Sequence, residues 1–478
     1  MKKHNWAKQH KWLGLILAFF IIMFAVSGLV LNHPLLFSHV DISRQWLPSD
    51  YQYNHWNKGL MRSTIAWHNK VIIYGDNGLW LTDSTAKKVS DLNRGLPTGA
   101  DNRQIRRVVQ THKGDVFALS TYELYQLHTD THTWHRIEIK RCSDERLSDI
   151  DCVGDSLIIT SRSMVYMSTP PYRTFKLITL PAANNYQHEV SLFRTVWLLH
   201  SGELFGTIGK IVVDLIALTL ILLSVSGIAC WFLPKLHIKL LRHLTRYNFL
   251  FHNKIGKVTI ILTLFICITG WFLRPPALIA IAKAKIHPIP FSTMDSNNAW
   301  HDKLRTLRYD DEVGDWLLYS SDGFYRLSSL QAVPQAEAVQ PDVSVMGINA
   351  QTKDAQGRWL IGSFSGMFVW DRQHHSLIDY YTHRPHTTSK GIPFSNHAVA
   401  GYTANFGSTP LVVDYQQGIP TLPMPSSMRI LPMSLRHLCI EIHTGRIYTF
   451  IGKANILFIF FMGLLIMWCI WSGKMLKM

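Results

Sequence analysis

Four long apolar runs dominate the hydropathy pattern of this 478-residue chain. The runs are Trp12–Leu31, Ile211–Leu233, Ile255–Leu273 and Ala454–Ile470. Each is close to the ~20 residues that a helix needs to cross a hydrocarbon layer about 30 Å thick. No small-residue cleavage site follows the first run, so we expect a retained anchor and not a signal peptide. The pattern predicts a membrane protein with four spanning helices.

Lysine and arginine crowd the N-terminal segment, the connection between the second and third runs, and the C-terminal tail. The positive-inside rule therefore predicts that both termini and this connection are cytoplasmic. Much of the net charge of +16 then reflects membrane topology. Because no basic stripe stands apart from the membrane flanks, the charge does not indicate nucleic-acid binding.

These signals divide the chain into seven predicted segments. They are a first spanning helix with its cytoplasmic N-terminus at 1–33, an exported β segment at 34–201, a second spanning helix at 202–233, a basic cytoplasmic connection at 234–251, a third spanning helix at 252–274, a second exported β segment at 275–444, and a fourth spanning helix with the cytoplasmic tail at 445–478.

An internal duplication organises the chain. The stretch from His10 matches the stretch from His252, with glycine and proline recurring at a constant offset of 242 residues. Likewise HSGELFGTIGK, from His200, matches HTGRIYTFIGK, from His443. Two independent matches at nearly one offset predict two copies of a helix, an exported domain and a second helix.

Every apolar run also carries a Ser-Gly or Thr-Gly pair near its C-terminal end. The pairs are Ser27-Gly28, Ser226-Gly227, Thr269-Gly270 and Ser472-Gly473. Small residues let helices approach closely in lipid. Plain helix packing is the interpretation we prefer for them.

The exported segments show a repeated β pattern. A tight turn, a short strand, a second turn and an aromatic-bearing strand recur about every 40–50 residues, the size of a four-stranded propeller blade. The repeats begin at His68, Lys113, Val153, Val313 and Gln356, with a degenerate sixth at Phe406. Three units in each half predict one all-β domain resembling a six-bladed propeller, although two small separate β domains are the alternative. A short interfacial helix is expected within 277–286.

Histidines placed by the duplication predict two metal-binding pairs. Helix directions put His10 and His252 at the inner membrane face, and His200 and His443 at the outer face. A haem iron accepts one neutral imidazole on each side of its flat macrocycle. We therefore predict two b-type haems, one per leaflet, that provide a path for electrons. His33 also lies at the outer face and could replace one outer ligand.

Asp214 and Arg274 are further candidate site residues. A carboxylate inside a membrane span is a functional candidate by default. A local ion pair with Lys210, at the favourable i, i+4 spacing, is an equal alternative for Asp214. Arg274 could neutralise a haem propionate, or its side chain could reach to the lipid headgroups.

Cys142 and Cys152 lie ten residues apart in one exported segment. An oxidising compartment would favour a disulfide between them, and two free thiols are the alternative.

The membrane segments resemble a known family. The motifs HKWLGLIL with SGLVLNHP, LHSGELFGTIGKIVVDL, HNKIGKV with TGWFLRP, and IHTGRIYTFIGK are similar to the PepSY-associated transmembrane family. That family includes iron-regulated inner-membrane proteins and ferric-siderophore reductases of Gram-negative bacteria. The resemblance implies a bacterial inner-membrane b-type haem protein that passes electrons to a periplasmic acceptor, such as ferric iron held by a siderophore. Its implied haem ligands are His10, His200, His252 and His443, with His33 as a further candidate.

Three function classes follow from these observations. The first is a transmembrane haem oxidoreductase. Its donor would be external, quinol or a cytoplasmic reductase, since no GxGxxG follows a strand near a cytoplasmic end. The second is a non-redox, membrane-anchored β-propeller that binds a periplasmic ligand or protein partner. A transporter subunit is the weakest of the three, because four spans with one intramembrane acid make a poor substrate path.

Overall fold

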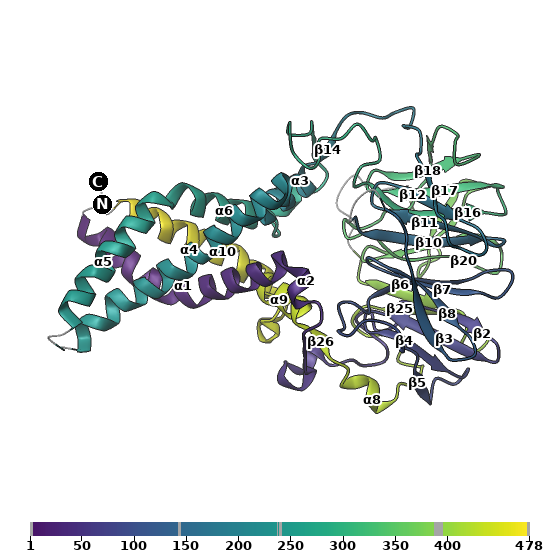
Figure 1. The fold of residues 1–478 in the computed structure, drawn as a ribbon, viewed down its shortest axis with the longest axis horizontal. Coiled ribbons are helices and arrows are strands. Elements are labelled where there is room, and N and C mark those ends of the chain that lie inside the picture. Colours follow the sequence, from purple (N-terminus) through teal and green to yellow (C-terminus); the bar gives the residue numbers. More distant parts are fainter. Residues whose placement is uncertain (1–2, 142–144, 237, 239–240, 387–394, 476–478) are drawn as a thin grey trace. The chain divides into compact units, whose positions relative to one another are not determined.

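The computed structural model describes residues 3–141, 145–236, 238, 241–386 and 395–475. They form two compact units (Figure 1). The helical unit contains Met1–Phe37, His188–Asp295 and Leu435–Met478, and the β unit contains Ser38–Gln187 and Ser296–Ser434. Each unit therefore draws on both halves of the duplicated sequence.

Three helices in the described part of the chain are long and apolar enough to cross a membrane: α1 (Lys3–Asn32), α4 (Gly206–Phe232) and α10 (Asn455–Met475). A fourth crossing requires α5 (Leu241–Val258) and α6 (Ile260–Phe272) to be taken as one span that is bent by 64°. Helix α1 packs against α4 and α10, and α6 packs against the same two helices.

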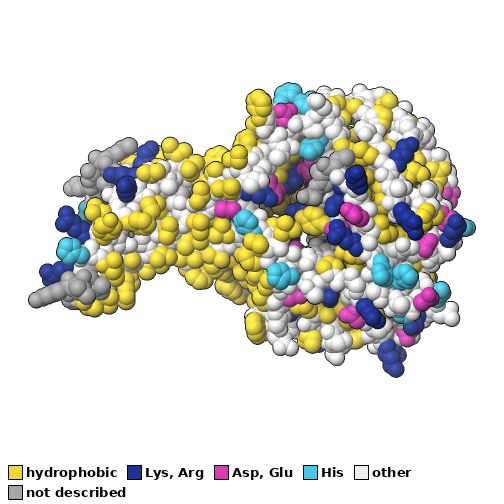
Figure 2. Space-filling view, viewed as in Figure 1, with side chains coloured by type: hydrophobic (Ala, Val, Ile, Leu, Met, Phe, Trp, Pro, Cys, Tyr) yellow, Lys and Arg dark blue, Asp and Glu magenta, His cyan; other side chains and the backbone are white. Residues whose placement is uncertain are grey.

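The outer surface of the helical unit is apolar. Figure 2 shows hydrophobic side chains along this unit, with Lys and Arg gathered at the end where the termini lie. Large apolar residues such as Ile16, Phe19 and Leu215 are more than half exposed. An exposed apolar surface of this size is expected to face lipid. The chain is thus a membrane protein.

The third predicted span differs from the expectation of one straight helix beginning at residue 252. Helix α5 begins at Leu241, inside the predicted connection, and carries basic and aromatic residues. The chain bends at Thr259, whose hydroxyl donates to the Ile255 carbonyl at 2.9 Å. A basic amphipathic helix is stable at a membrane interface, whereas the apolar α6 is stable in hydrocarbon. The change of direction coincides with that change of composition.

Short helices precede the second and fourth spans. Helix α3 (Leu192–Ser201) ends at Gly202, which has a left-handed φ of 80°, and α9 (Leu435–His443) is followed by Gly445 with a φ of 73°. Both breaks separate a histidine-bearing helix from the apolar helix that follows. The unit also contains α2 (Pro34–Phe37), α7 (Ala277–Ile281), the paired strands β14 (Val190–Ser191) and β15 (Lys285–Ile286), and 3₁₀ turns at Glu203–Phe205, Leu233–Leu236 and Thr449–Ala454.

The β unit, as far as it is described, contains five four-stranded antiparallel sheets and a sixth of two strands. The first three sheets contain β2 (Ser63–Trp67), β3 (Lys70–Gly75), β4 (Gly78–Thr82) and β5 (Val89–Asp91); β6 (Ile105–Gln110), β7 (Val116–Ser120), β8 (Leu124–His128) and β9 (Thr133–Ile137); and β10 (Leu147–Val153), β11 (Ser156–Ser161), β12 (Val165–Ser168) and β13 (Lys176–Ile178). The others contain β16 (Leu304–Asp310), β17 (Asp315–Ser320), β18 (Gly323–Leu327) and β19 (Gln335–Ala336); β20 (Ile348–Lys353), β21 (Trp359–Ser363), β22 (Gly366–Asp371) and β23 (Ser376–Asp379); and β24 (Val399–Thr403) with β25 (Leu411–Asp414). Outside these sheets are β1 (Asp41–Ile42) paired with β26 (Met433–Ser434), α8 (Ser426–Arg429), and 3₁₀ turns at Arg44–Trp46 and Ser49–Tyr51.

Successive sheets of the β unit pack face to face. Strand β6 contacts β2 and β10, β10 contacts β16, and β24 contacts both β20 and β2. The Thr306 hydroxyl on β16 donates to the Gln351 side chain on β20 at 2.6 Å. Residues from the first sheet, such as Ile73, share one buried cluster with Val413 of the last. The two β segments therefore form one all-β domain and not two separate ones.

The degenerate sixth repeat begins as predicted: Phe406 precedes β25 (Leu411–Asp414), just as the other predicted starts precede the second strand of their sheets. Its first strand, β24, lies at Val399–Thr403. A Cβ on Gly401 would lie 2.1 Å from the carbonyl oxygen of Arg62, so the neighbouring strand leaves room for glycine alone. This small residue interrupts the apolar pattern that marks the other repeats.

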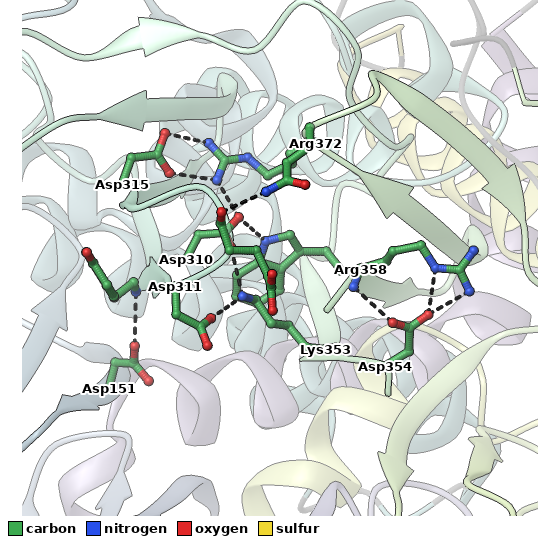
Figure 3. Close-up of polar contacts among 12 residues, drawn as sticks. Asp151, Asp310, Asp311, Asp315, Lys353, Asp354, Arg358 and Arg372 are labelled. Carbon is green, nitrogen blue, oxygen red and sulfur yellow. Dashed lines mark hydrogen bonds and ion pairs between the residues drawn. The ribbon is translucent and has the colours of Figure 1, made fainter. Parts of the chain in front are cut away.

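A buried ion network links the fourth and fifth sheets (Figure 3). Arg372, directly after β22, contacts Asp310 at 2.5 Å, Asp315 at 2.7 Å and Glu337 at 2.6 Å. The Trp359 indole also donates to Asp310 at 2.7 Å. Lys353 lies 2.8 Å from the other Asp310 oxygen, so each charge of the network faces an opposite charge, as buried charges require. We assign the network a structural role.

Candidate functional site

The structure brings the inner pair of predicted histidines together. His10 projects from α1 and His252 from α5, with their ring centroids 6.1 Å apart and their planes inclined by 59°. The Nδ1 atom of His10 lies 3.0 Å from the Cys469 carbonyl and 3.2 Å from the Ser472 hydroxyl, both on α10. The Nδ1 atom of His252 lies 2.9 Å from the Ser226 hydroxyl on α4.

The outer pair repeats this geometry on α3 and α9. The ring centroids of His200 and His443 are 5.9 Å apart, and their planes are inclined by 54°. The Nδ1 atom of His443 lies 3.0 Å from the Phe24 carbonyl and 3.1 Å from the Ser27 hydroxyl, both on α1. The Nδ1 atom of His200 lies 3.1 Å from the Thr269 hydroxyl on α6. Each of the four histidines is thus held by the opposite half of the duplicated chain.

These hydrogen bonds fix the tautomer of the imidazoles. Each of the four hydroxyls donates its own proton to a backbone carbonyl of its helix, at 2.6 to 3.0 Å. A hydroxyl has one proton, so it can only accept from the imidazole. The backbone carbonyls of Cys469 and Phe24 can also only accept, so Nδ1 is the protonated nitrogen of His10 and His443 and the lone pair of these rings lies on Nε2. Metal-binding histidines are commonly oriented in this way by a partner on the other ring nitrogen.

The glycine of each Ser/Thr-Gly pair makes room for an imidazole. A Cβ at Gly270 would lie 2.7 Å from Cε1 of His200, and one at Gly473 would lie 3.0 Å from Cε1 of His10. A Cβ at Gly28 would lie 3.4 Å from Cε1 of His443, and one at Gly227 would lie 3.4 Å from Cε1 of His252. The sequence-based preference for plain helix packing therefore misses what these pairs contact. The recurrence of the pairs was visible in the sequence, but their histidine partners come from the other half of the chain.

The spacing of each pair fits an iron porphyrin. Two metal–nitrogen bonds of about 2 Å each place two imidazole centres roughly 6 Å apart. The inclination between the rings is compatible with this, because each ring can rotate about the axis through the metal. Among the described residues, no three or more His, Cys, Asp or Glu side chains are grouped to hold a bare metal ion. A porphyrin supplies four ligands itself and needs only the two imidazoles.

The two pairs are separated along the membrane helices. From His10 to Ser27, which holds the outer His443, α1 rises about 25 Å at ~1.5 Å per residue. This separation is close to the ~30 Å thickness of the hydrocarbon layer. The pairs are therefore spaced for opposite leaflets.

His33 and Asp214 contact each other. The Nε2 atom of His33 lies 2.9 Å from Asp214, and the Asn32 amide donates to the other carboxylate oxygen at 3.0 Å. Lys210 instead pairs with Glu203 at 3.3 Å. The expected local pair between Lys210 and Asp214 is wrong, because the end of α1 supplies Asp214 with closer partners. His33 therefore contacts Asp214 through Nε2, whereas the outer pair consists of His200 and His443.

Arg274 lies near the outer pair. Burial and, to a smaller extent, the positive charge of Arg274 together lower the pKa of His200 to about 4. Burial likewise lowers the pKa of His443 to about 3, with contributions from His200 and Arg274. Both imidazoles are therefore neutral at physiological pH, which is the form that binds iron.

The predicted disulfide involves Cys142, which lies outside the described residues. The Cys152 thiol lies 3.0 Å from the Gly154 carbonyl, and burial raises its pKa to about 11. A thiol in this environment is protonated and unreactive.

A comparison with models of protein families identifies the family of the chain. The model described as the PepSY-associated TM region matches residues 1–234 and 171–476. The chain belongs to the PepSY-associated TM region family. The two PepSY-associated TM matches together include all four paired histidines. A search of curated proteins gives no match.

Solved structures resemble the chain only distantly. The extracellular domain of the hybrid two component system BT4673 from B. thetaiotaomicron is 9% identical with a TM-score of 0.36, covering 75% of this chain and 32% of that one. PorZ, a surface component of the type-IX secretion system of Porphyromonas gingivalis, is 9% identical with a TM-score of 0.34, covering 73% and 38%. The chain thus spans about a third of the length of these proteins.

Proposed function

We propose that this protein is a b-type haem membrane protein that passes electrons across the bilayer to a periplasmic acceptor. The observation that supports this most is the arrangement of the four histidines. They form two pairs at the spacing of a bis-imidazole iron site, and each imidazole is oriented by a hydroxyl from the opposite half. A haem bound in this way supplies reversible one-electron chemistry.

The residues of each pair have distinct tasks in this proposal. His10 and His252 would hold the inner haem through Nε2, and His200 and His443 would hold the outer one. The Ser and Thr hydroxyls keep the proton on Nδ1 and so keep Nε2 available as a ligand. The apolar walls of the helices exclude water from both sites. Outer-sphere electron transfer needs no nucleophile or general base from the protein.

The proposal includes a finer fold. Spans α1, α4, α10 and the bent α5–α6 would form a four-helix bundle, supported by the packing of α1 and α6 on the same two helices. The six sheets would form a propeller-like ring, supported by the contact of the last sheet with the first. The basic ends of the helices support an inner-membrane location with cytoplasmic termini and a periplasmic β domain.

Donor and acceptor follow from the same topology. Electrons would enter at the inner pair from quinol or a cytoplasmic reductase, and leave at the outer pair toward ferric iron held by a siderophore. Arg274, at the outer end of α6, would balance the negative charge of a haem propionate there. Its electrostatic effect on both outer histidines supports this role.

Transmembrane electron transfer tests the proposal. Purified protein is placed in sealed vesicles with a membrane-impermeant reductant inside and a ferric chelate with a ferrous indicator outside. We expect external iron reduction by the wild type, and its loss in His252→Ala. His243→Ala, an exposed position on the same helix α5, is the matched control and should retain the rate. Colourless protein that reduces no iron, despite full haem supply, would favour the non-redox binding propeller.

A further inference from the structure

The first strands of the β sheets share an irregularity near their N-terminal ends. In five of the described sheets, one extra residue interrupts the pairing of the first strand with the second. A bulge of this kind re-aims the side chain of the extra residue. The bulged residues are Arg106, Ser148, Arg305, Asn349 and Ala400.

Further arginines lie next to strand ends in the neighbouring sheets. Arg62 directly precedes β2, and Arg146 directly precedes β10. Arg162 lies in the turn after β11, and its backbone N–H donates to the Arg146 carbonyl at 3.1 Å. Because β2, β6 and β10 are successive first strands in contact, their starting ends gather these side chains at one end of the β domain. Arg62, Arg106, Arg146 and Arg162 are called the arginine cluster below.

Arg106 is at the centre of the arginine cluster. Its side chain is exposed to solvent. Desolvation by the surrounding protein and the like charges of Arg62, Arg146 and Arg162 together lower its pKa to about 10, against the opposing effect of the Asp76 carboxylate. The guanidinium therefore lies among like charges.

Two members of the arginine cluster are paired with carboxylates. Arg62 pairs with Asp76 at 2.8 Å, and Arg162 pairs with Asp302 at 2.9 Å. Among the residues that the structure describes, no hydrogen bond or ion pair is made by the guanidinium of Arg106. Repulsion from three neighbouring arginines, offset only in part by Asp76, makes the position of the Arg106 guanidinium unfavourable in the absence of a ligand.

We propose that the arginine cluster binds a small soluble molecule that carries two or more carboxylate or phosphate groups. Guanidinium groups recognise both anions through paired, charge-assisted hydrogen bonds. Arg106 and Arg146, both exposed, make direct contacts with the anion, whereas Arg62 and Arg162 supply a fixed positive field. This gives the β domain a ligand-binding role that is independent of haem.

Titration calorimetry on the full-length protein tests the site with three probes. Citrate and inorganic pyrophosphate separate the carboxylate and phosphate classes, and acetate controls for a single charge. We expect one citrate or one pyrophosphate per chain, acetate at least about 100-fold weaker, and affinity that falls with added salt. Failure of both polyanions to bind at millimolar concentration would overturn the proposal.

Variants separate a binding role from a structural one. Arg106→Gln and Arg146→Gln should each weaken polyanion binding by about tenfold or more, as loss of a charge-assisted hydrogen bond does. Arg136→Gln is the matched control and should bind polyanions as the wild type does. Arg136 lies on the fourth strand of the same sheet as Arg106 and forms a solvent-exposed ion pair with Glu123. Without ligand, Arg106→Gln should raise the melting temperature, because repulsion is relieved. Unchanged binding in both cluster variants, or a lowered melting temperature for Arg106→Gln, would contradict the assignment.

Discussion

Replacing Gly270 by alanine is expected to displace the imidazole of His200 and to disrupt the outer haem site. The new Cβ would lie 2.7 Å from Cε1 of His200, whereas ordinary van der Waals contact begins at 3.4 Å. The ring must therefore retreat by about 0.7 Å. Metal–ligand distances tolerate deviations of only about 0.2 Å. Substitution of a residue that only orients a metal ligand already costs about 10- to 100-fold in metal affinity. We therefore expect haem affinity at the outer site to fall by at least about 100-fold.

Folding of the helix should not suffer from this substitution. Alanine is favoured over glycine inside a helix by about 1 kcal/mol. A loss of haem in Gly270→Ala would therefore report the geometry of the site and not unfolding. Gly256→Ala on the neighbouring α5 is the matched control, because its Cβ would make an ordinary 3.6 Å contact with Leu223.

The assay is the haem-to-protein ratio together with the reduced-minus-oxidised spectrum. We expect two haems per chain in the control and one in Gly270→Ala. The glycine series should be graded: Gly473→Ala, with a 3.0 Å contact, should weaken the inner site less, and Gly28→Ala and Gly227→Ala, at 3.4 Å, should keep both haems. Equal haem content in Gly270→Ala and Gly256→Ala would refute the reasoning.

Three further substitutions test other parts of the account. Ser226→Ala should remove the acceptor for His252 Nδ1 and weaken haem binding at the inner pair by about 10- to 100-fold, measured by competition with a haem acceptor protein. Arg372→Ala should lower the free energy of unfolding by about 3–5 kcal/mol in denaturant titrations, because it leaves buried carboxylates unpaired. Arg358→Ala is the control: it breaks a partly exposed pair with Asp354 and should lower the free energy of unfolding by less than about 1 kcal/mol. Asp214→Asn should lower the thermal stability of the helical unit but preserve the haem spectrum; loss of that spectrum would place Asp214 in the haem site.

The arrangement of the membrane unit followed from the sequence because composition and duplication both constrain it. Apolar length predicted the spans, and the offset that joins His10 to His252 predicted which imidazoles face each other. The bend at Thr259 was missed, since a basic amphipathic stretch and a polar connection have similar composition. Periodicity within residues 241–258 could have revealed the helix, because its polar and apolar positions lie on separate faces.

Contacts between distant segments were the least predictable. Asp214 has a local candidate partner in Lys210, but the end of α1 brings His33 closer. The glycine at position 401 in β24 is likewise dictated by a distant neighbour, the backbone carbonyl of Arg62 directly before the first sheet. In both cases the deciding neighbour lies more than 100 residues away in the sequence, where local patterns carry no information.

The most direct test of the central claim is the haem content of the purified protein and of two single-histidine variants. We expect two b-type haems per chain in the wild type, one in His10→Ala and one in His443→Ala, because each variant lacks one of the two histidines that would hold a haem. A wild-type protein without haem under full haem supply, or a haem content that neither substitution changes, would contradict it.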